Sequence, residues 1–320
     1  MLKRPLGNSG LETAPLIFGG NVFGWTIDPV VSFQVLDAFV DAGFNAIDTA
    51  DVYSRWIPGN VGGESETIIG EWLKARGRRD DVLILTKVGS SMGQHGTDAR
   101  NDLSAAWIER EIEDSLRRLQ TDVIDLYQSH FMDKATPTEE TLRAYERLIQ
   151  AGKVRAIGAS NHDVPALREA LDLAASKGLP RYETLQPHYN LYSRKTFEGP
   201  LQDLAVAEGL GVITYFSLES GFLSGKYKTI ADLEGAKRGG YLKDRFDERG
   251  VRILAVLDGV AQRNEATPAQ VALAWLLSRP GVTAPIVSAT SVEQLADTMK
   301  AATLELTADD LAELTEASED

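Results

Sequence analysis

The sequence alternates short runs of β-branched and apolar residues with longer amphipathic stretches, and this alternation recurs eight times along 320 residues. The stretches between the runs have the length and the apolar spacing of helices. Strands separated by helices favour right-handed βαβ crossovers, which build a parallel sheet. The runs that we expect to be strands are 16–20, 44–48, 82–88, 123–128, 154–160, 183–186, 211–216 and 284–288.

Eight βα units are the number that closes a (β/α)₈ barrel. An open, doubly wound sheet is the competing architecture, but no GxGxxG motif follows the first run, which weakens it. At about 150 residues per domain the length would allow two domains, although α/β barrels often exceed 250 residues as one unit. We therefore expect a single barrel domain over residues 1–320.

Three local patterns add detail to this barrel. Gly-Asn-Ser-Gly at 7–10 lies between two short apolar segments and predicts an N-terminal β-hairpin. The segment 104–119 has Ser104 in the position of a helix N-cap. Two connections, 89–103 after the third strand and 217–250 after the seventh, are longer than the minimal repeat, and long loops are often functional.

Composition excludes several classes of partner. Lys and Arg number 33 against 47 Asp and Glu, so the formal charge is 33 − 47 = −14, which disfavours nucleic acid and anionic membranes. Apolar runs such as 271–277 are too short to span a bilayer. The absence of cysteine excludes disulfides and thiol nucleophiles. The N-terminus has no apolar run typical of a secretory signal, so we expect a cytoplasmic protein.

Several catalytic motifs are missing. The four histidines form no HExxH pair, so we expect no metal site. There is no GxSxG nucleophile motif. The segment 221–227 is one residue short of a P-loop. Hydrolytic and nucleotide-cleaving chemistry therefore lack their usual sequence signals.

Titratable side chains gather instead where the predicted strands end. Asp48 closes the second strand, Tyr53 follows five residues later, Lys87 lies near the end of the third strand, and His130 follows the fourth. Each alone has an ordinary structural explanation, such as turn capping or packing. Because the carboxyl ends of the strands form one face of a parallel barrel, the four together predict an acid–base site.

The chain resembles the aldo-keto reductase superfamily along nearly its whole length. The matching segments are D-T-A-D-x-Y (48–53), L-T-K (85–87), D-L-Y-Q-x-H (125–130), G-A-S-N (158–161), Gln186 with Tyr189-Asn190, G-x-L-S-G-K-Y (221–227) and A-T-S-x-x-Q-L (289–295). Their order and spacing make the resemblance specific. It implies a (β/α)₈ barrel that reduces aldehydes or ketones, or oxidises the alcohols, with a nicotinamide cofactor.

Physical reasoning gives the four residues matching roles. A carbonyl that accepts hydride becomes an alkoxide and needs a proton donor, which Tyr53 can be. A Lys87 ammonium would stabilise the phenolate by roughly 4 kcal/mol at 4 Å and an effective dielectric of 20. Asp48 would keep Lys87 charged, and His130 would orient the carbonyl.

The resemblance also implies cofactor contacts. Ser160, Asn161 and Gln186 match residues that bind the nicotinamide amide, and Tyr215 matches the ring that stacks on nicotinamide. The residues matching the pyrophosphate loop are Ser217, Leu218, Gly221 and Lys226. Capping, turn formation and barrel packing are the structural alternatives for these positions.

Cofactor choice depends on the last strand. Ser288, Thr290, Gln294 and Thr298 occupy the region where many members carry a basic residue for the 2′-phosphate of NADP, and no Lys or Arg occurs from 285 to 299. Because Thr290, Gln294 and nearby backbone amides can reach a phosphate, we expect NADP(H) first and NAD(H) second. A second departure from the family pattern is Phe216-Ser217, where many members have Ser-Pro.

The substrate candidates are mostly aromatic. They are Val22, Phe23, Trp25, Trp56 and Phe131, with the 89–103 loop, and core packing explains each of the five equally well. The expected partner is a small carbonyl or alcohol.

Two other functions remain alternatives. One is a cofactor-binding regulatory subunit, as in channel-associated relatives, and the other is an unrelated barrel isomerase or lyase. The complete set of four residues, including His130, favours the enzyme.

Overall fold

The computed structural model describes residues 2–91, 101–236 and 239–319, and its centre is a closed barrel of eight parallel strands. Hydrogen-bonded neighbours follow the order β10-β3-β4-β5-β6-β7-β8-β9. The strands are β3 (Ile17–Gly19), β4 (Ala46–Asp48), β5 (Leu83–Val88), β6 (Ile124–Ser129), β7 (Val154–Ser160), β8 (Tyr182–Gln186), β9 (Gly211–Thr214) and β10 (Val282–Val287). All eight lie within or overlap the runs predicted from sequence, so the (β/α)₈ barrel is confirmed.

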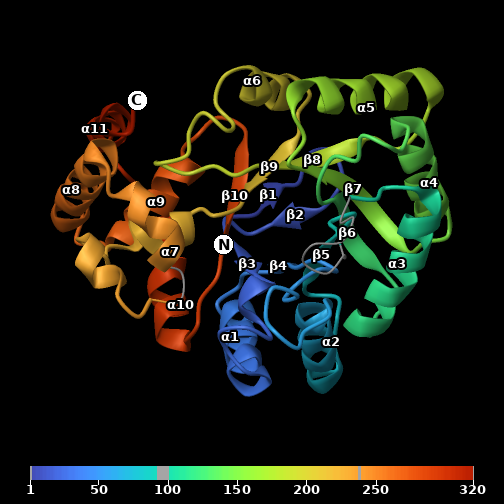
Figure 1. Ribbon diagram of the computed structural model, residues 1–320, viewed down its shortest axis with the longest axis horizontal. Helices are drawn as coiled ribbons and strands as arrows, with labels where there is room; N and C mark the ends of the chain where they lie inside the picture. Colours follow the sequence, from blue (N-terminus) through green and yellow to red (C-terminus); the bar gives the residue numbers. More distant parts are fainter. Residues whose placement is uncertain (1, 92–100, 237–238, 320) are drawn as a thin grey trace.

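Helices surround this barrel on all sides (Figure 1). The α-helices are α1 (Pro29–Asp41), α2 (Glu64–Arg76), α3 (Ala105–Leu119), α4 (Thr138–Gln150), α5 (Val164–Lys177), α6 (Pro200–Ala207), α7 (Gly239–Leu242), α8 (Glu248–Arg263), α9 (Pro268–Leu277), α10 (Val292–Met299) and α11 (Ala308–Ala317). Short 3₁₀ turns are η1 (Gly20–Val22), η2 (Glu219–Ser224), η3 (Ile230–Leu233), η4 (Lys243–Arg245) and η5 (Lys300–Thr303). No helix in the described ranges is long and apolar enough to cross a membrane.

The predicted N-terminal hairpin is present as the antiparallel pair β1 (Arg4–Pro5) and β2 (Glu12–Thr13). Leu6 and Leu11, in the turn region between its strands, are fully buried and pack with the side chains that point into the barrel. Gly7 has φ +60°, and a Cβ there would lie 2.0 Å from the Glu183 carbonyl oxygen. The hairpin therefore covers the end of the barrel where strands begin, and only glycine fits its closest approach.

Local sequence signals place the helix ends. The Ser104 side chain accepts a hydrogen bond from the amide of Trp107 and caps α3, as predicted. Gly178 ends α5 in the left-handed conformation with φ +65°, which glycine adopts without steric cost. The buried apolar side chains of the helices and the outer face of the strands form one continuous core, in which α11 packs on α8 and α8 packs on α9.

The longest described connection follows β9 and holds η2, η3, α7 and η4 before α8 begins at Glu248. It confirms the predicted extended loop after the seventh barrel strand. The predicted loop after β5 is only partly within the described residues, since 92–100 lie outside them. Both connections leave the carboxyl ends of their strands, where the site lies.

Candidate active site

Four predicted residues meet at the carboxyl ends of three neighbouring strands. Asp48 is the last residue of β4, Lys87 is the fifth residue of β5, and His130 follows β6 directly. Tyr53 lies in the connection between β4 and α2. Parallel pairing aligns β4 with β5 and β5 with β6, so residues distant in sequence share one end of the barrel.

The Lys87 ammonium is the centre of this group. Its Nζ donates to Asp48 Oδ2 at 2.7 Å, to the Thr49 carbonyl oxygen at 2.7 Å and to the Tyr53 hydroxyl at 3.3 Å. Asp48 and Lys87 are buried, whereas Tyr53 is half-buried. The three donors of the ammonium are therefore matched to three acceptors, one of which is the phenol.

Burial and the neighbouring opposite charges shift the pKa values of Lys87 and Tyr53 in opposite directions. Burial favours neutral Lys87, but the Asp48 carboxylate and the Tyr53 hydroxyl outweigh it and raise the pKa of Lys87. Burial raises the pKa of Tyr53, the Lys87 ammonium partly offsets this rise, and Asp48 adds to it. At neutral pH Lys87 is therefore a cation and Tyr53 carries its proton.

His130 completes the group as a neutral imidazole. Burial, together with the positive charge of Lys87, lowers the pKa of His130 well below its usual value. Its ring centroid lies 6.0 Å from that of Tyr53, and its Nδ1 is buried without a hydrogen-bond partner among the described residues. The imidazole therefore makes no side-chain hydrogen bond to another described residue, and its hydrogen-bonding capacity is not used within the protein.

Aromatic side chains extend from this centre on both sides. Trp56 contacts Tyr53 edge-to-face at 5.4 Å and Trp25 at 5.7 Å, while Phe131 stacks on His130 at 4.8 Å. Trp56 and Phe131 are 40% and 36% exposed, so both present a ring surface to an approaching molecule. These contacts form an aromatic wall of Trp25, Trp56 and Phe131 around the polar centre.

The remaining two substrate candidates lie elsewhere. Val22 and Phe23 are buried within the outer core, and the Phe23 ring stacks on Phe18 at 5.4 Å. Their surroundings correspond to core packing, the alternative left open by the sequence. These side chains are covered because η1, which holds Val22 and ends at Phe23, lies against α2.

The predicted nicotinamide contacts lie at the ends of β7, β8 and β9. The Asn161 amide donates to the His130 carbonyl oxygen at 2.9 Å, and Asn161 Oδ1 accepts from the Tyr215 hydroxyl at 2.7 Å. The Ser160 hydroxyl donates to the Gln186 carbonyl oxygen, and Gln186 Nε2 donates to Asp48 Oδ1 at 3.0 Å. An amide oxygen accepts two hydrogen bonds, so Asn161 retains the capacity for one more.

The segment after β9 has an unusual backbone. Phe216, Glu219 and Ser220 have φ of 51°, 45° and 56°, and Gly221 has φ 100°. Of the predicted pyrophosphate residues, Ser217 is buried and bonds Thr214, Leu218 and Gly221 are half-buried, and the Lys226 ammonium lies exposed 4.7 Å from the Tyr227 ring centroid. Left-handed residues in succession turn backbone amides toward one side, which suits an anion.

The residues near β10 differ in exposure. Thr290 and Gln294 are exposed at the start of α10 and bonded to each other, with Gln294 Oε1 accepting from the Thr290 amide at 2.9 Å. Ser288 donates to the Gly19 carbonyl oxygen at 2.7 Å. Thr298 is buried and donates to the carbonyl oxygen of Gln294 within its own helix. Thr290 and Gln294 therefore face solvent, whereas Thr298 has a structural partner.

Two features of this region escaped the sequence prediction. Gln128 lies in β6 with its amide nitrogen 3.4 Å from Asp48 Oδ1. The two-residue alternation of β6, in which Leu126 also points into the barrel, could have revealed it. The second feature is Glu219, which is buried at 4% exposure and bonds four side chains.

Fold and site together define a (β/α)₈ barrel with a polar, partly aromatic site at the carboxyl ends of its strands. The chain belongs to the aldo/keto reductase family, whose family model matches residues 15–319. Membership supports oxidoreductase activity in general, and the family generally uses nicotinamide cofactors, typically NADP(H).

Three relatives illustrate the range of the family. An uncharacterized oxidoreductase YrpG of Bacillus subtilis is 37% identical over 94% of this chain and 91% of its own length. Protein tas of Escherichia coli is 33% identical over 96% and 94%. A probable voltage-gated potassium channel subunit beta of Oryza sativa is 34% identical over 94% and 91%.

Proposed function

We propose that this protein transfers hydride between a nicotinamide cofactor and an aldehyde or ketone, or the alcohol in the reverse direction. The observation that carries the proposal is the position of Lys87 Nζ, which bonds both Asp48 and the Tyr53 hydroxyl. A phenol that must give up its proton needs positive charge beside it. Here that charge is buried, where its electrostatic effect is strongest.

Each of the four residues has a task in this reaction. Tyr53 donates the proton to the oxygen of the carbonyl as charge develops on it. Lys87 stabilises the resulting phenolate, and Asp48 holds Lys87 charged and in place. Neutral His130 has an N–H that can donate to the carbonyl oxygen and orient it toward the phenol.

The residues around this centre fit a nicotinamide dinucleotide. Amide and hydroxyl groups of Ser160, Asn161 and Gln186 at neighbouring strand ends suit a carboxamide, and the half-buried Tyr215 ring suits a flat heterocycle. When bound, the cofactor supplies or accepts the hydride. The left-handed backbone after β9, with Ser217, Leu218, Gly221 and Lys226, suits the pyrophosphate.

We propose NADP(H) as the preferred cofactor and NAD(H) as the second choice. Thr290 and Gln294 face solvent at the N-terminus of α10, where hydroxyl, amide and backbone N–H groups can bind a 2′-phosphate. Basic residues are missing from this stretch, so discrimination between the two cofactors should be weaker than in a site with an arginine.

The aromatic wall of Trp25, Trp56 and Phe131 favours a small, mainly apolar carbonyl or alcohol. Its rings approach Tyr53 and His130 from two sides, so they would cover the apolar part of such a substrate. Because nicotinamide cofactors are supplied inside the cell, we place the activity in the cytoplasm.

A cofactor-binding regulatory subunit with little turnover is the second candidate, because one relative is named a probable potassium channel subunit beta. Both candidates bind the cofactor and differ in turnover. The test is therefore a titration with NADPH and NADH, followed by reduction assays on a panel of aldehydes and ketones.

The variant Tyr53→Phe makes this test specific to the proposed acid. We expect the reduction rate to fall by about 10²–10⁴-fold, the usual contribution of a general acid, while NADPH affinity persists. Tyr145→Phe is the matched control, because it removes a hydroxyl that bonds Ser129 rather than Lys87. Undiminished turnover in Tyr53→Phe would reject the acid, and tight NADPH binding without turnover of any carbonyl would favour the regulatory candidate.

A further inference from the structure

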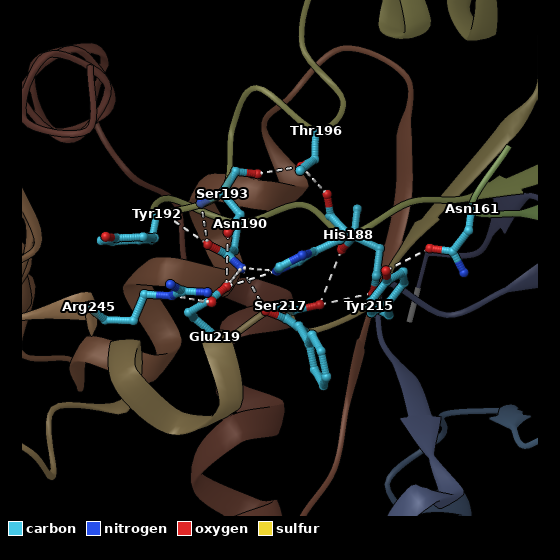
Figure 2. A network of polar contacts seen from close by, with 12 residues as sticks. Asn161, His188, Asn190, Tyr192, Ser193, Thr196, Tyr215, Ser217, Glu219 and Arg245 are labelled. Atoms are coloured by element: carbon cyan, nitrogen blue, oxygen red, sulfur yellow. Dashed lines mark hydrogen bonds and ion pairs between the residues drawn. The ribbon is translucent and has the colours of Figure 1, made fainter. Parts of the chain in front are cut away.

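A buried carboxylate lies near Tyr215, the residue predicted to stack on the nicotinamide ring. The reaction proposed above gives this carboxylate no role. Glu219 is 4% exposed, and its Oε2 accepts from His188 Nε2 at 2.8 Å, the Asn190 amide at 2.6 Å and the Ser193 hydroxyl at 3.1 Å. Its Oε1 accepts from Arg245 Nε at 2.7 Å. Figure 2 shows these side chains converging on Glu219 from separate segments of the chain.

The network keeps this carboxylate ionised. Burial would raise the pKa of Glu219, but hydrogen bonds and charge from His188, with those from Arg245 and Asn190, lower it to about 2. A buried carboxylate with four donors is well satisfied, so its position is firmly fixed. The backbone of Glu219 has φ +45°, a conformation that costs free energy in a residue with a side chain. The contacts of its side chain offset that cost.

His188 transmits this fixed position to Tyr215. The two rings are stacked with centroids 5.3 Å apart and planes 24° from parallel. Their backbones form a parallel bridge, and the Tyr215 amide donates to the Pro187 carbonyl oxygen at 3.0 Å. The far end of Tyr215 is held by its hydroxyl, which donates to Asn161 (Figure 2). The ring is therefore supported on one face by His188 and at its tip by Asn161.

Arg245 brings a distant segment into the same network. It belongs to η4, in the long connection after β9, and its guanidinium also lies 5.0 Å from the ring centroid of Tyr192. Asn190 ties the network to the chain beside Tyr215, because its amide also donates to the Phe216 carbonyl oxygen at 2.9 Å. One carboxylate thus joins the η4 segment, the segment after β8 and the loop after β9.

We propose that Glu219 is a positioning residue that fixes the Tyr215 ring through His188 and links its orientation to the η4 segment through Arg245. The inference rests on the proposed function, in which Tyr215 supports the nicotinamide ring. Its consequence is selective: loss of the network should weaken binding of the nicotinamide half of the cofactor. The adenosine half binds near α10 in the proposal and should be affected less.

Two ligands and two His188 variants test this selectivity. The ligands are NADPH and adenosine 2′,5′-bisphosphate, which lacks nicotinamide, titrated by quenching of tryptophan fluorescence. His188→Leu removes the ring, and we expect it to weaken NADPH binding by about 3- to 10-fold, the range for one aromatic contact, without changing bisphosphate binding. His188→Phe keeps a ring against Tyr215 and should recover part of the NADPH affinity. The emission of bound NADPH should shift in the leucine variant, since it reports the surroundings of nicotinamide.

The link to η4 is tested with a pair of arginines in the same part of the chain. Arg245→Gln should weaken NADPH binding more than bisphosphate binding, because it releases Glu219. Arg249→Gln is the matched control: it removes the same charge nearby, but Arg249 bonds the carbonyl oxygens of Tyr192 and Ser318 rather than Glu219. Circular dichroism melting checks that each variant folds.

The outcomes separate the inference from the proposed function. Unchanged NADPH affinity and emission in folded His188→Leu and Arg245→Gln would overturn the inference alone. Equal weakening of both ligands in Arg245→Gln and Arg249→Gln would also overturn it, since charge would then explain the effect. Failure of the wild-type protein to bind NADPH would overturn the proposed function and the inference with it.

Discussion

Gln186 Nε2 donates a hydrogen bond to Asp48 Oδ1 across 3.0 Å, so a predicted cofactor contact and the predicted acid–base group share one carboxylate. Asp48 binds Lys87 through its other oxygen at 2.7 Å. Gln128 approaches Oδ1 as well, at 3.4 Å. The orientation of Asp48 is therefore fixed from both sides, and changes at Gln186 should affect both binding and chemistry.

The first prediction separates these two effects. Gln186→Met should weaken NADPH binding by about 10-fold, the effect of losing one good hydrogen bond, and should also lower the reduction rate. Gln128→Met removes the contact with Asp48 and the 3.3 Å hydrogen bond that Gln128 Oε1 accepts from Gln186 Nε2, but it keeps the Gln186 side chain and its bond to Asp48. It should therefore lower the rate and weaken NADPH binding less than Gln186→Met does. Fluorescence titration and steady-state kinetics measure the two quantities. Equal loss of NADPH affinity in both variants would contradict the assignment of Gln186.

The second prediction concerns the pH dependence of carbonyl reduction. The pKa of Tyr53 is raised by burial and by Asp48 against the opposing Lys87, so the acid stays protonated until the pH exceeds its usual value of 10.0. The reaction rate should therefore be constant through neutral pH and fall only in the alkaline range. The pKa of His130 is lowered by burial and by Lys87, so no inflection should occur near 6.5.

A profile of kcat/KM against pH checks both statements. Lys87→Met is the companion variant, because it removes the charge that favours the phenolate; its rate should fall by about 10²-fold or more at every pH. An inflection near 6.5 that disappears in His130→Asn would show that His130 titrates in the working range and would contradict its neutral form.

Sequence reasoning reached the barrel because the signals for it are local and repeated. Each strand is a short apolar run, and each helix has its own signals, such as the Ser104 cap of α3 and Gly178 at the end of α5. The meeting of Asp48, Lys87 and His130 followed from the topology, since parallel strands align their carboxyl ends. The proposed roles of these residues came from the family resemblance and from physical reasoning. The structure adds that Lys87 lies between Asp48 and Tyr53 and bonds both.

The residues that sequence reasoning missed depend on contacts between segments far apart in the chain. Glu219 and Arg245 are 26 residues apart, and His188 contacts Glu219 from the segment after β8. No periodicity encodes such contacts. Val22 and Phe23 were predicted as substrate contacts because they are apolar and follow the first barrel strand. In the structure the turn η1 buries both of them in the core. Side-chain direction in turns depends on tertiary packing, which a single sequence does not contain.

The third prediction tests cofactor choice at α10. Thr290→Arg places a guanidinium at an exposed position beside the N-terminus of the helix, where a 2′-phosphate is expected. It should strengthen NADPH binding relative to NADH by about 10-fold, because charge-assisted hydrogen bonds to phosphate are strong. Thr290→Gln is a neutral control of comparable reach. An equal gain for NADPH and NADH would place the 2′-phosphate elsewhere.

The last prediction concerns Asp51, a fully buried residue near Tyr53 whose carboxylate oxygens make no well-formed hydrogen bond within the described residues. Burial, with repulsion from Glu66 and Glu111 and partial compensation by Arg118, raises the pKa of Asp51 well above its usual value. Above the unfolded pKa of about 3.9, the unfolded chain releases a proton that the folded chain retains, so this residue makes stability fall as pH rises.

Asp51→Asn replaces the titrating carboxyl group with a neutral amide. The substitution should therefore stabilise the fold more at pH 8 than at pH 4. We expect the difference in the free energy of unfolding between the two pH values to change by about 1 kcal/mol or more, the lower range for an unsatisfied buried polar group. Urea denaturation at both pH values measures it, with exposed Asp80→Asn as the control. The same shift in both variants would mean that folding does not raise the pKa of Asp51. A loss of stability in Asp51→Asn that grows with pH would mean that Asp51 is ionised and paired in the folded protein.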